Sequence, residues 1–294
     1  MTLLRCDPHW RRCWLPHGLL PSEGEPASLT TLELAQPDTC HYLRTVCRVK
    51  TGDWLTGVSP ASVDEPQGQG WQYPIQVQAV TRTTVTVAIA LQAGSPCHSS
   101  PWPWRLGLAC GYLKEAAWDE LLPQATALGV DVIQPLLTER TQNQHQASER
   151  TQKRAERIQT LLATAALQCE RGTLPQVATP LALHAWLSQL PHHDGAVVLR
   201  ERFASTTALS QIMSEWRTHL TPNTPPTLWC VVGPEGGWSD DEAKQWDALA
   251  TTSQCDTQTS FWQLSVSPWV LRSELAAMAG LALLSASPTL QTLG

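Results

Sequence analysis

The stretch from Leu228 to Glu242, with the sequence LWCVVGPEGGWSDDE, constrains the fold of this chain more than any other. Its apolar start, Leu228 to Val232, is typical of a short buried strand. The glycines that follow allow backbone angles that other residues cannot adopt, so a tight turn is expected. Ser239 and Glu242 then have the spacing of a capping box, which predicts the start of a helix.

A strand, a glycine turn and a capped helix together present backbone N–H groups to a ligand in α/β domains. The glycine spacing matches neither the dinucleotide-binding nor the P-loop fingerprint. Glu235 lies inside the turn, where its charge would repel a phosphate. A ligand that carries hydroxyls, an amine or an adenine edge is therefore expected here.

The pattern of residues changes partway along the chain. Residues 1–95 contain alternating β-branched runs, which predict a β-rich domain, and a proline-rich linker follows. From residue 104 to residue 294, predicted strands and helices alternate. This alternation indicates an α/β domain with a mainly parallel sheet covered by helices. A chain of 294 residues is long enough for two such domains.

Composition excludes some classes of protein. The net charge of −6 argues against a protein that coats nucleic acid indiscriminately, but it allows a local basic face. The nine cysteines lack zinc-site spacing and no signal peptide is apparent, so reduced thiols, no metal and a cytoplasmic location are expected. The longest apolar stretch, Ala276–Ala286, is shorter than the roughly 20 residues of a membrane helix. No membrane partner is expected.

A second stretch, Leu264–Ala276, reads LSVSPWVLRSELA and predicts a strand, a turn and a helix that opens at Arg272. Together with GPEGGWSxxE, it resembles the RsmE family of SPOUT methyltransferases. Further segments are similar to the family in the same order. These are HYLRTVCRVKTGDWLTGV from His41, Lys114 with the following ATALGV, IQPLLTERT from Ile133, and the spacing of Gln168, Arg171 and Pro175.

This resemblance implies a fold and a reaction. It implies an N-terminal PUA-like β-barrel over residues 1–95 and a C-terminal SPOUT domain over residues 104–294, threaded as a trefoil knot. The implied reaction transfers a methyl group from S-adenosylmethionine (SAM) to N3 of a uridine. The implied substrate is the decoding region of 16S rRNA within the small ribosomal subunit. A homodimer formed through the SPOUT domain is implied as well.

The resemblance implies that three segments on the knot side contact SAM, and we expect them to act mostly through backbone groups: Leu199 and Glu201; Val232, Gly233, Glu235, Gly236 and Gly237; and Leu264, Val266, Ser267, Val270 and Leu271. The catalytic candidates are Arg272, Glu274 and Arg140. Arg272 and Glu274 have a structural alternative, an ion pair that only stabilises the domain. The expected RNA contacts are Arg5, Arg44, Arg48, Lys50 and Lys114, because cations bind phosphates.

Two other functions remain open. One is a different SPOUT specificity, such as methylation of the ribose 2′-oxygen. The other is a catalytically silent RNA-binding or ribosome-assembly module. This alternative is motivated by three departures from the family pattern: Ser267 replaces a glycine, Trp269 replaces an arginine or threonine, and Leu275 replaces a threonine.

Overall fold

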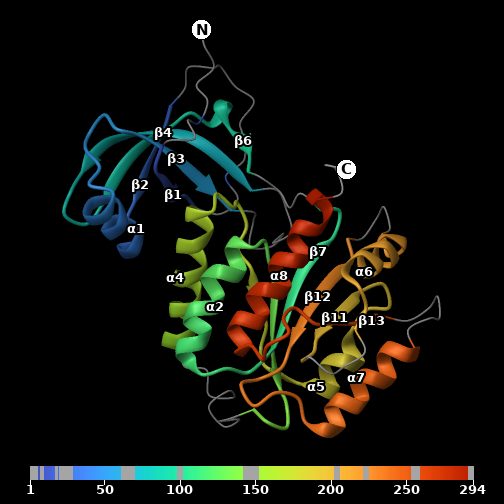
Figure 1. Ribbon diagram of the computed structural model, residues 1–294. Coiled ribbons are helices and arrows are strands. Elements are labelled where there is room, and N and C mark those ends of the chain that lie inside the picture. The colour runs from blue at the N-terminus through green and yellow to red at the C-terminus, as the bar shows by residue number, and fades with distance from the viewer. Residues whose placement is uncertain are drawn as a thin grey trace. The chain divides into compact units, whose positions relative to one another are not determined.

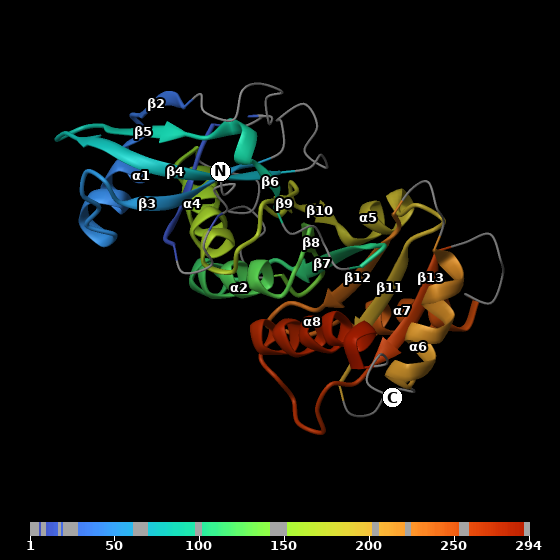
Figure 2. The same ribbon diagram turned by 90° about the horizontal axis from the view of Figure 1, so that it is seen from above.

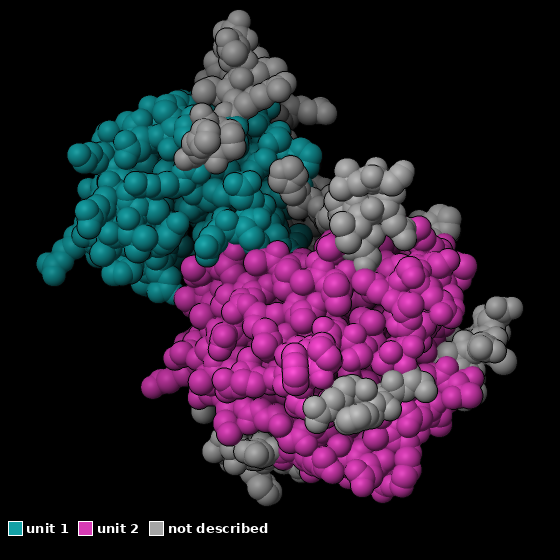
Figure 3. Space-filling view, viewed as in Figure 1, with its two compact units in different colours: residues 1–99, 166–174 teal, residues 100–165, 175–294 magenta. Residues whose placement is uncertain are grey.

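The structure is a computed structural model of the chain, and it describes residues 6, 10–16, 19, 29–60, 70–97, 102–141, 152–201, 206–220, 225–252 and 259–290. The chain divides into two compact units (Figure 3). Unit 1 comprises residues 1–99 and 166–174, and unit 2 comprises residues 100–165 and 175–294. Residues 166–174, which the sequence analysis placed in the second domain, thus group with the N-terminal unit.

Unit 1 is built on a sheet that has six strands in the described part of the chain. Hydrogen-bonded neighbours follow the order β1 (Arg12–Trp14), β3 (Trp54–Ser59), β4 (Trp71–Val80), β5 (Val85–Ile89) and β2 (Thr30–Leu34), and β6 (Ser95–Pro96) pairs with β4. All pairs are antiparallel except β1 with β3. The short helical elements are α1 (Pro37–His41), η1 (Tyr42–Val46) and η2 (Leu91–Ala93). The β-rich character predicted for this region is therefore confirmed.

Unit 2 contains a wholly parallel sheet, with seven strands among the described residues. Its order is β10 (Leu181–Ala182), β8 (Val132–Leu137), β7 (Arg105–Gly111), β12 (Thr227–Val232), β11 (Gly195–Leu199) and β13 (Ser260–Leu264), and β9 (Gln176–Val177) pairs with β8. The central strands β7, β11 and β12 are buried along nearly their whole length. This burial explains their continuous apolar sequences.

Helices cover both faces of the sheet in unit 2. On one face lie α2 (Glu115–Ala127), α4 (Gln152–Gln168), α6 (Leu209–Trp216) with η3 (Arg217–His219), and α8 (Ser273–Leu290). On the other face lie α5 (Leu183–Gln189) and α7 (Asp240–Thr252). Figure 1 shows α2 and α8 in front of β7 and β12, where α8 packs against both strands and against α2. This arrangement confirms the predicted α/β architecture.

The order of the strands determines where the predicted site segments lie. β11 is hydrogen-bonded to β12 on one side and to β13 on the other, and all three strands run in the same direction (Figure 2). The segments after residues 199, 232 and 264 therefore leave the sheet at one edge. The carboxyl edge of a parallel sheet is where α/β proteins bind ligands.

The helix predicted after the glycine turn is present as α7, and its capping box is formed. The Ser239 backbone N–H donates to Glu242 Oε2 at 2.8 Å. In return, the Glu242 N–H donates to Ser239 Oγ at 3.2 Å. The reciprocal bonds satisfy two N–H groups that the start of a helix would otherwise leave without acceptors.

No helix in the described part of the chain is long and apolar enough to cross a membrane. Among the same residues, no three or more His, Cys, Asp or Glu side chains cluster so that they could hold a metal ion.

Candidate functional site

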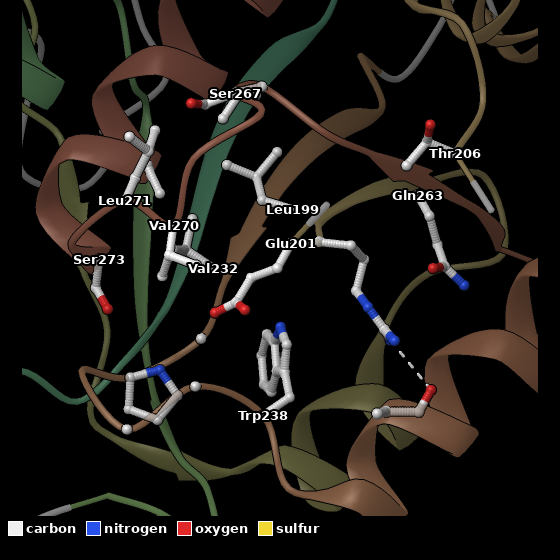
Figure 4. Close-up of a pocket in the computed structure, with 18 of the residues that line it drawn as sticks. Leu199, Glu201, Thr206, Val232, Trp238, Gln263, Ser267, Val270, Leu271 and Ser273 are labelled. Atoms are coloured by element: carbon white, nitrogen blue, oxygen red, sulfur yellow. Dashed lines mark hydrogen bonds between the residues drawn. The ribbon is translucent and has the colours of Figure 1, made fainter. Parts of the chain in front are cut away.

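A cleft of about 830 Å³ lies at the carboxyl edge of β11, β12 and β13 (Figure 4). Its walls come from the ends of these strands and the segments that follow them, from α7, from the first turn of α8 and from Arg140. The predicted cofactor contacts that line it are Leu199, Glu201, Val232, Gly233, Glu235, Gly236, Gly237, Val266, Ser267, Val270 and Leu271. The remaining predicted contact, Leu264, is buried in the core and does not line the cleft.

The glycine turn forms one wall of the cleft through its backbone. Gly237 has a φ of +70°, a region that favours glycine, and its N–H donates to the Pro234 carbonyl at 2.8 Å. A Cβ at Gly236 would lie 3.2 Å from Arg140 Cβ, so the turn is also tightly packed. Backbone groups at this wall therefore remain accessible where side chains would have filled the space.

Arg140 is held against the turn by the capping box of α7. Glu242 Oε1 accepts the backbone N–H of Glu139 at 3.0 Å, and this bond fixes the loop that carries Arg140. The Arg140 guanidinium donates to the Gly236 carbonyl at 3.3 Å and lies 3.6 Å from the Asp240 carboxylate. The structure thus places this catalytic candidate beside the turn, where its contacts with Gly236 and Asp240 position the wall of the cleft.

The opposite end of the cleft is polar, and its residues are not among those predicted from the sequence. Arg200 donates to the Ala243 carbonyl at 3.1 Å (the dashed line in Figure 4) and pairs with Asp247 at 3.6 Å. Asp247 Oδ1 also accepts the side-chain N–H of Gln263 at 2.9 Å. The Gln263 amide is therefore oriented with its nitrogen toward Asp247.

Two buried polar atoms of the cleft lining have no hydrogen-bond partner in the described structure: Gln263 Oε1 and Trp238 Nε1. A buried polar atom without a partner costs about 1–3 kcal/mol. A ligand that brings a donor to Gln263 and an acceptor to Trp238 would recover this cost. Trp238 belongs to the GPEGGWS stretch, so the sequence could have identified it as a site residue. Gln263 lies in β13, where every residue is buried, so no pattern in the sequence distinguishes it as a site residue.

A smaller pocket of about 290 Å³ adjoins the cleft. It lies between the first turns of α2 and α8, and Glu235 and Ser273 line both cavities. The other residues that line it are Lys114, Ala116, Ala117, Arg272 and Glu274. The structure thus brings the predicted catalytic residues Arg272 and Glu274 next to the predicted cofactor contacts.

The charged groups of this pocket form two ion pairs. Arg272 Nε lies 3.0 Å from Glu274 Oε1, where the carboxylate side chain is 6% exposed and the arginine side chain is 84% exposed. Buried Glu274 therefore anchors a guanidinium whose outer part faces solvent. Lys114 Nζ lies 3.1 Å from Glu235 Oε2, so this predicted RNA contact is paired with the glycine turn.

The other predicted RNA contacts belong to unit 1. One of them, Arg5, lies outside the described residues. Arg44, Arg48 and Lys50 are exposed and lie within seven residues of one another. Arg44 donates to the Arg82 carbonyl. Arg48 has a φ of +52°, which makes it one of two non-glycine residues with positive φ in the described chain.

The parallel sheet with helices on both faces, and the cleft at the ends of three adjacent strands, belong to a SPOUT methyltransferase fold, which the chain shares with solved structures over nearly its whole length. A family model described as an RNA methyltransferase domain matches residues 100–285. The chain belongs to this RNA methyltransferase family, and its resemblance to RsmE is confirmed.

Individual relatives agree with this assignment. The ribosomal RNA small subunit methyltransferase E of Synechocystis sp. is 28% identical over 215 residues, which are 73% of this chain but only 61% of the relative. The protein of the same name from Rickettsia conorii is 24% identical over 256 residues, 87% of this chain and 90% of the relative. A Legionella pneumophila structure described as a methyltransferase with bound SAM is 26% identical, with a TM-score of 0.66 over 94% of this chain and 97% of its own.

Proposed function

We propose that this protein uses SAM to methylate N3 of a uridine in the decoding region of 16S rRNA, within the small ribosomal subunit. The observation that carries this proposal is the cleft at the ends of β11, β12 and β13, next to the pocket that contains Arg272 and Glu274. Family membership supports the RNA methyltransferase activity. The names of the relatives support the choice of rRNA.

The residues that line the cleft fit the chemistry of SAM. Leu199, Val232 and Val270 offer an apolar surface to an adenine ring (Figure 4). SAM carries an amine, hydroxyls and ring nitrogens, so it has donors for Gln263 Oε1 and acceptors for Trp238 Nε1. The carboxylate of Glu201, which points into the cleft, is suited to a ligand with positive charge. SAM supplies a methyl group on a positively charged sulfur, which is a reactive electrophile.

The chain's main task is to align the nucleophile with this methyl group. The smaller pocket is suited to the uracil ring because it adjoins the cleft along Glu235 and Ser273. N3 of uracil carries a weakly acidic proton, so the site must remove that proton or stabilise the resulting anion. Arg272, held at its Nε by Glu274, can direct its other N–H groups to a uracil oxygen.

Contacts with the rest of the rRNA are assigned to exposed cations. Arg44, Arg48 and Lys50 suit phosphates because they are exposed and close together in the sequence. The net charge of −6 disfavours binding to RNA in general, which agrees with a substrate presented by an assembled subunit. We place the reaction in the cytoplasm, where such subunits are found in bacteria.

A second copy of the chain is the partner proposed for α8 and the segment before it. Trp269 is 73% exposed, Val270 is 54% exposed and Leu275 is 47% exposed. Ala282 and Ala286 continue the exposed apolar positions along α8. A homodimer would remove this apolar surface from water. Sedimentation analysis should give a dimer, and a monomer at micromolar concentration would contradict the proposal.

Nucleoside mass spectrometry tests the reaction itself. Small subunits from a strain that lacks this gene are incubated with the protein and methyl-labelled SAM, and the 16S rRNA is digested to nucleosides. The expected product is 3-methyluridine at one position. Labelled 2′-O-methyluridine would instead identify the ribose as the target, and the absence of both product and SAM binding would identify a silent module.

A further inference from the structure

We infer that Glu235 is the catalytic base that removes the proton from uracil N3. The inference rests on the proposed function. Glu235 is one of the residues that line both the cleft proposed for SAM and the smaller pocket proposed for the base. Proton removal and methyl transfer occur at the same nitrogen, so the base must lie where the two ligands meet.

The two oxygens of Glu235 are in different environments. Oε2 lies 3.1 Å from Lys114 Nζ, and this ion pair fixes the direction of the carboxylate. Oε1 has no hydrogen-bond donor in the described structure, and the side chain is 28% exposed, so a ligand can reach it. One oxygen is therefore held by the protein and the other is available to accept a proton.

The other carboxylates near the site are less suitable. Glu274 already interacts with Arg272 through Oε1 at 3.0 Å, and its side chain is almost completely buried. Glu201 lines the cleft but does not line the smaller pocket. Asp240 and Asp241 line neither cavity. Glu235 thus combines access to both cavities with a free oxygen.

Proton removal by Glu235 and methyl transfer to N3 need no reactant besides SAM and the uridine. The N3–H proton moves to Glu235 Oε1, and the electron pair left on N3 forms a bond to the methyl carbon. The bond between that carbon and sulfur breaks, and its electron pair stays on sulfur, which becomes a neutral thioether. The carboxylate and the sulfonium lose their charges together, and the glutamic acid then returns its proton to water.

The experiment compares Glu235→Gln with wild type in single-turnover methylation of small subunits over a range of pH. Because general base catalysis contributes roughly 100- to 10,000-fold, a loss in this range is expected at neutral pH. The rate of the variant should rise in proportion to hydroxide concentration, since only uracil that has already ionised can react. Calorimetry should give a SAM dissociation constant close to that of wild type.

Two further variants separate a base from a structural role. Lys114→Gln keeps the carboxylate and removes the group that orients it, so at a saturating concentration of small subunits it should lose less activity, at most roughly 100-fold, and keep the wild-type pH profile. Asp241→Asn removes an exposed carboxylate of α7 that pairs with Lys244, and it should match wild type in every measurement.

A chemical rescue completes the test. Subunits reconstituted with 5-fluorouridine rRNA carry a more acidic N3–H, because fluorine withdraws electrons from the ring. The rate of Glu235→Gln should increase on this substrate by a larger factor than the rate of wild type. A Glu235→Gln protein with the rate and pH profile of wild type would overturn the inference. It would also be overturned if the variant lost activity because it no longer bound SAM and if 5-fluorouridine rRNA did not restore its rate. If wild type forms no 3-methyluridine, the proposed function itself fails.

Discussion

At the scale of single residues, the shape of the cleft depends on how closely backbone segments approach one another. Gly111 ends β7 directly beneath the turn, and a Cβ placed there would lie 2.3 Å from the Pro234 backbone nitrogen. The neighbour is backbone rather than the end of a flexible side chain, so it cannot move without moving the turn. The position of the wall that faces SAM thus depends on residue 111 having no Cβ.

Gly111→Ala should therefore push the glycine turn outward. We expect a loss of about 1–3 kcal/mol in the free energy of unfolding, which is typical of overpacking, together with weaker SAM binding. Denaturant titration and calorimetry measure the two effects. Gly52→Ala is the control: it meets no atom within 4 Å but has a φ of +95°, so it should affect stability and leave SAM affinity unchanged.

At the scale of elements, Glu242 connects α7 to the segment after β8. Its buried carboxylate accepts the N–H of Ser239 and, across 103 positions of sequence, the N–H of Glu139. One side chain thus caps a helix and positions the loop that carries Arg140.

Glu242→Ala should be more damaging than Ser239→Ala. The first leaves two backbone N–H groups without their acceptor, at about 1–3 kcal/mol each, whereas loss of a capping hydroxyl costs about 1 kcal/mol. Asp241→Asn, in the same turn of α7 but exposed, should change the free energy of unfolding by less than about 0.5 kcal/mol. Equal losses for all three variants in urea titrations would contradict the assigned role of Glu242.

The contact between η3 and β13 should make stability depend on pH. His219 Nε2 lies 3.1 Å from Ser260 Oγ and the ring stacks on Trp216. Burial lowers the pKa of His219 below its ordinary value of 6.5, and nearby Glu215 opposes this shift. The unfolded chain therefore binds a proton more readily, so stability falls as pH drops from 6.5 through the lower pKa of the folded state.

His219→Gln removes this component because glutamine does not titrate. The stability advantage of wild type over His219→Gln should be largest above pH 6.5 and should shrink as the pH falls below it. Thermal unfolding at a series of pH values measures the difference. Curves that stay parallel between pH 7.5 and pH 5 would show that His219 does not contribute to the pH dependence.

Elements with strong local patterns were predictable, and elements defined by tertiary contacts were not. The apolar run of β12 and the capping box of α7 are local, so the sequence indicated both. The two-residue strands β9 and β10 exist only through pairing with β8, and no pattern that short is informative. Gln263 was not predictable either, because its orientation depends on a hydrogen bond to Asp247, which lies on α7.

At the scale of the whole molecule, an acidic protein must bind a polyanion through a few local cations. Arg44, Arg48 and Lys50 are exposed on unit 1, while the chain as a whole carries a net charge of −6. Binding through few phosphate contacts should depend only moderately on salt, because each contact releases about one counterion.

Lys50→Gln should weaken binding to small subunits and reduce the slope of log affinity against log salt concentration by about 1. Filter binding at a series of salt concentrations measures this slope. Lys244→Gln provides the control, because Lys244 is paired with Asp241 on α7 and should make no phosphate contact. An unchanged slope for Lys50→Gln would remove this lysine from the proposed interface.

The two adjoining cavities have a practical consequence for inhibition. Glu235 and Ser273 line both cavities, so a ligand in one cavity would lie close to a ligand in the other. An adenosine derivative tethered to a uracil ring by a short linker should therefore occupy both at once. Tethering makes the second binding event intramolecular, so such a bisubstrate compound should bind far more tightly than either half alone.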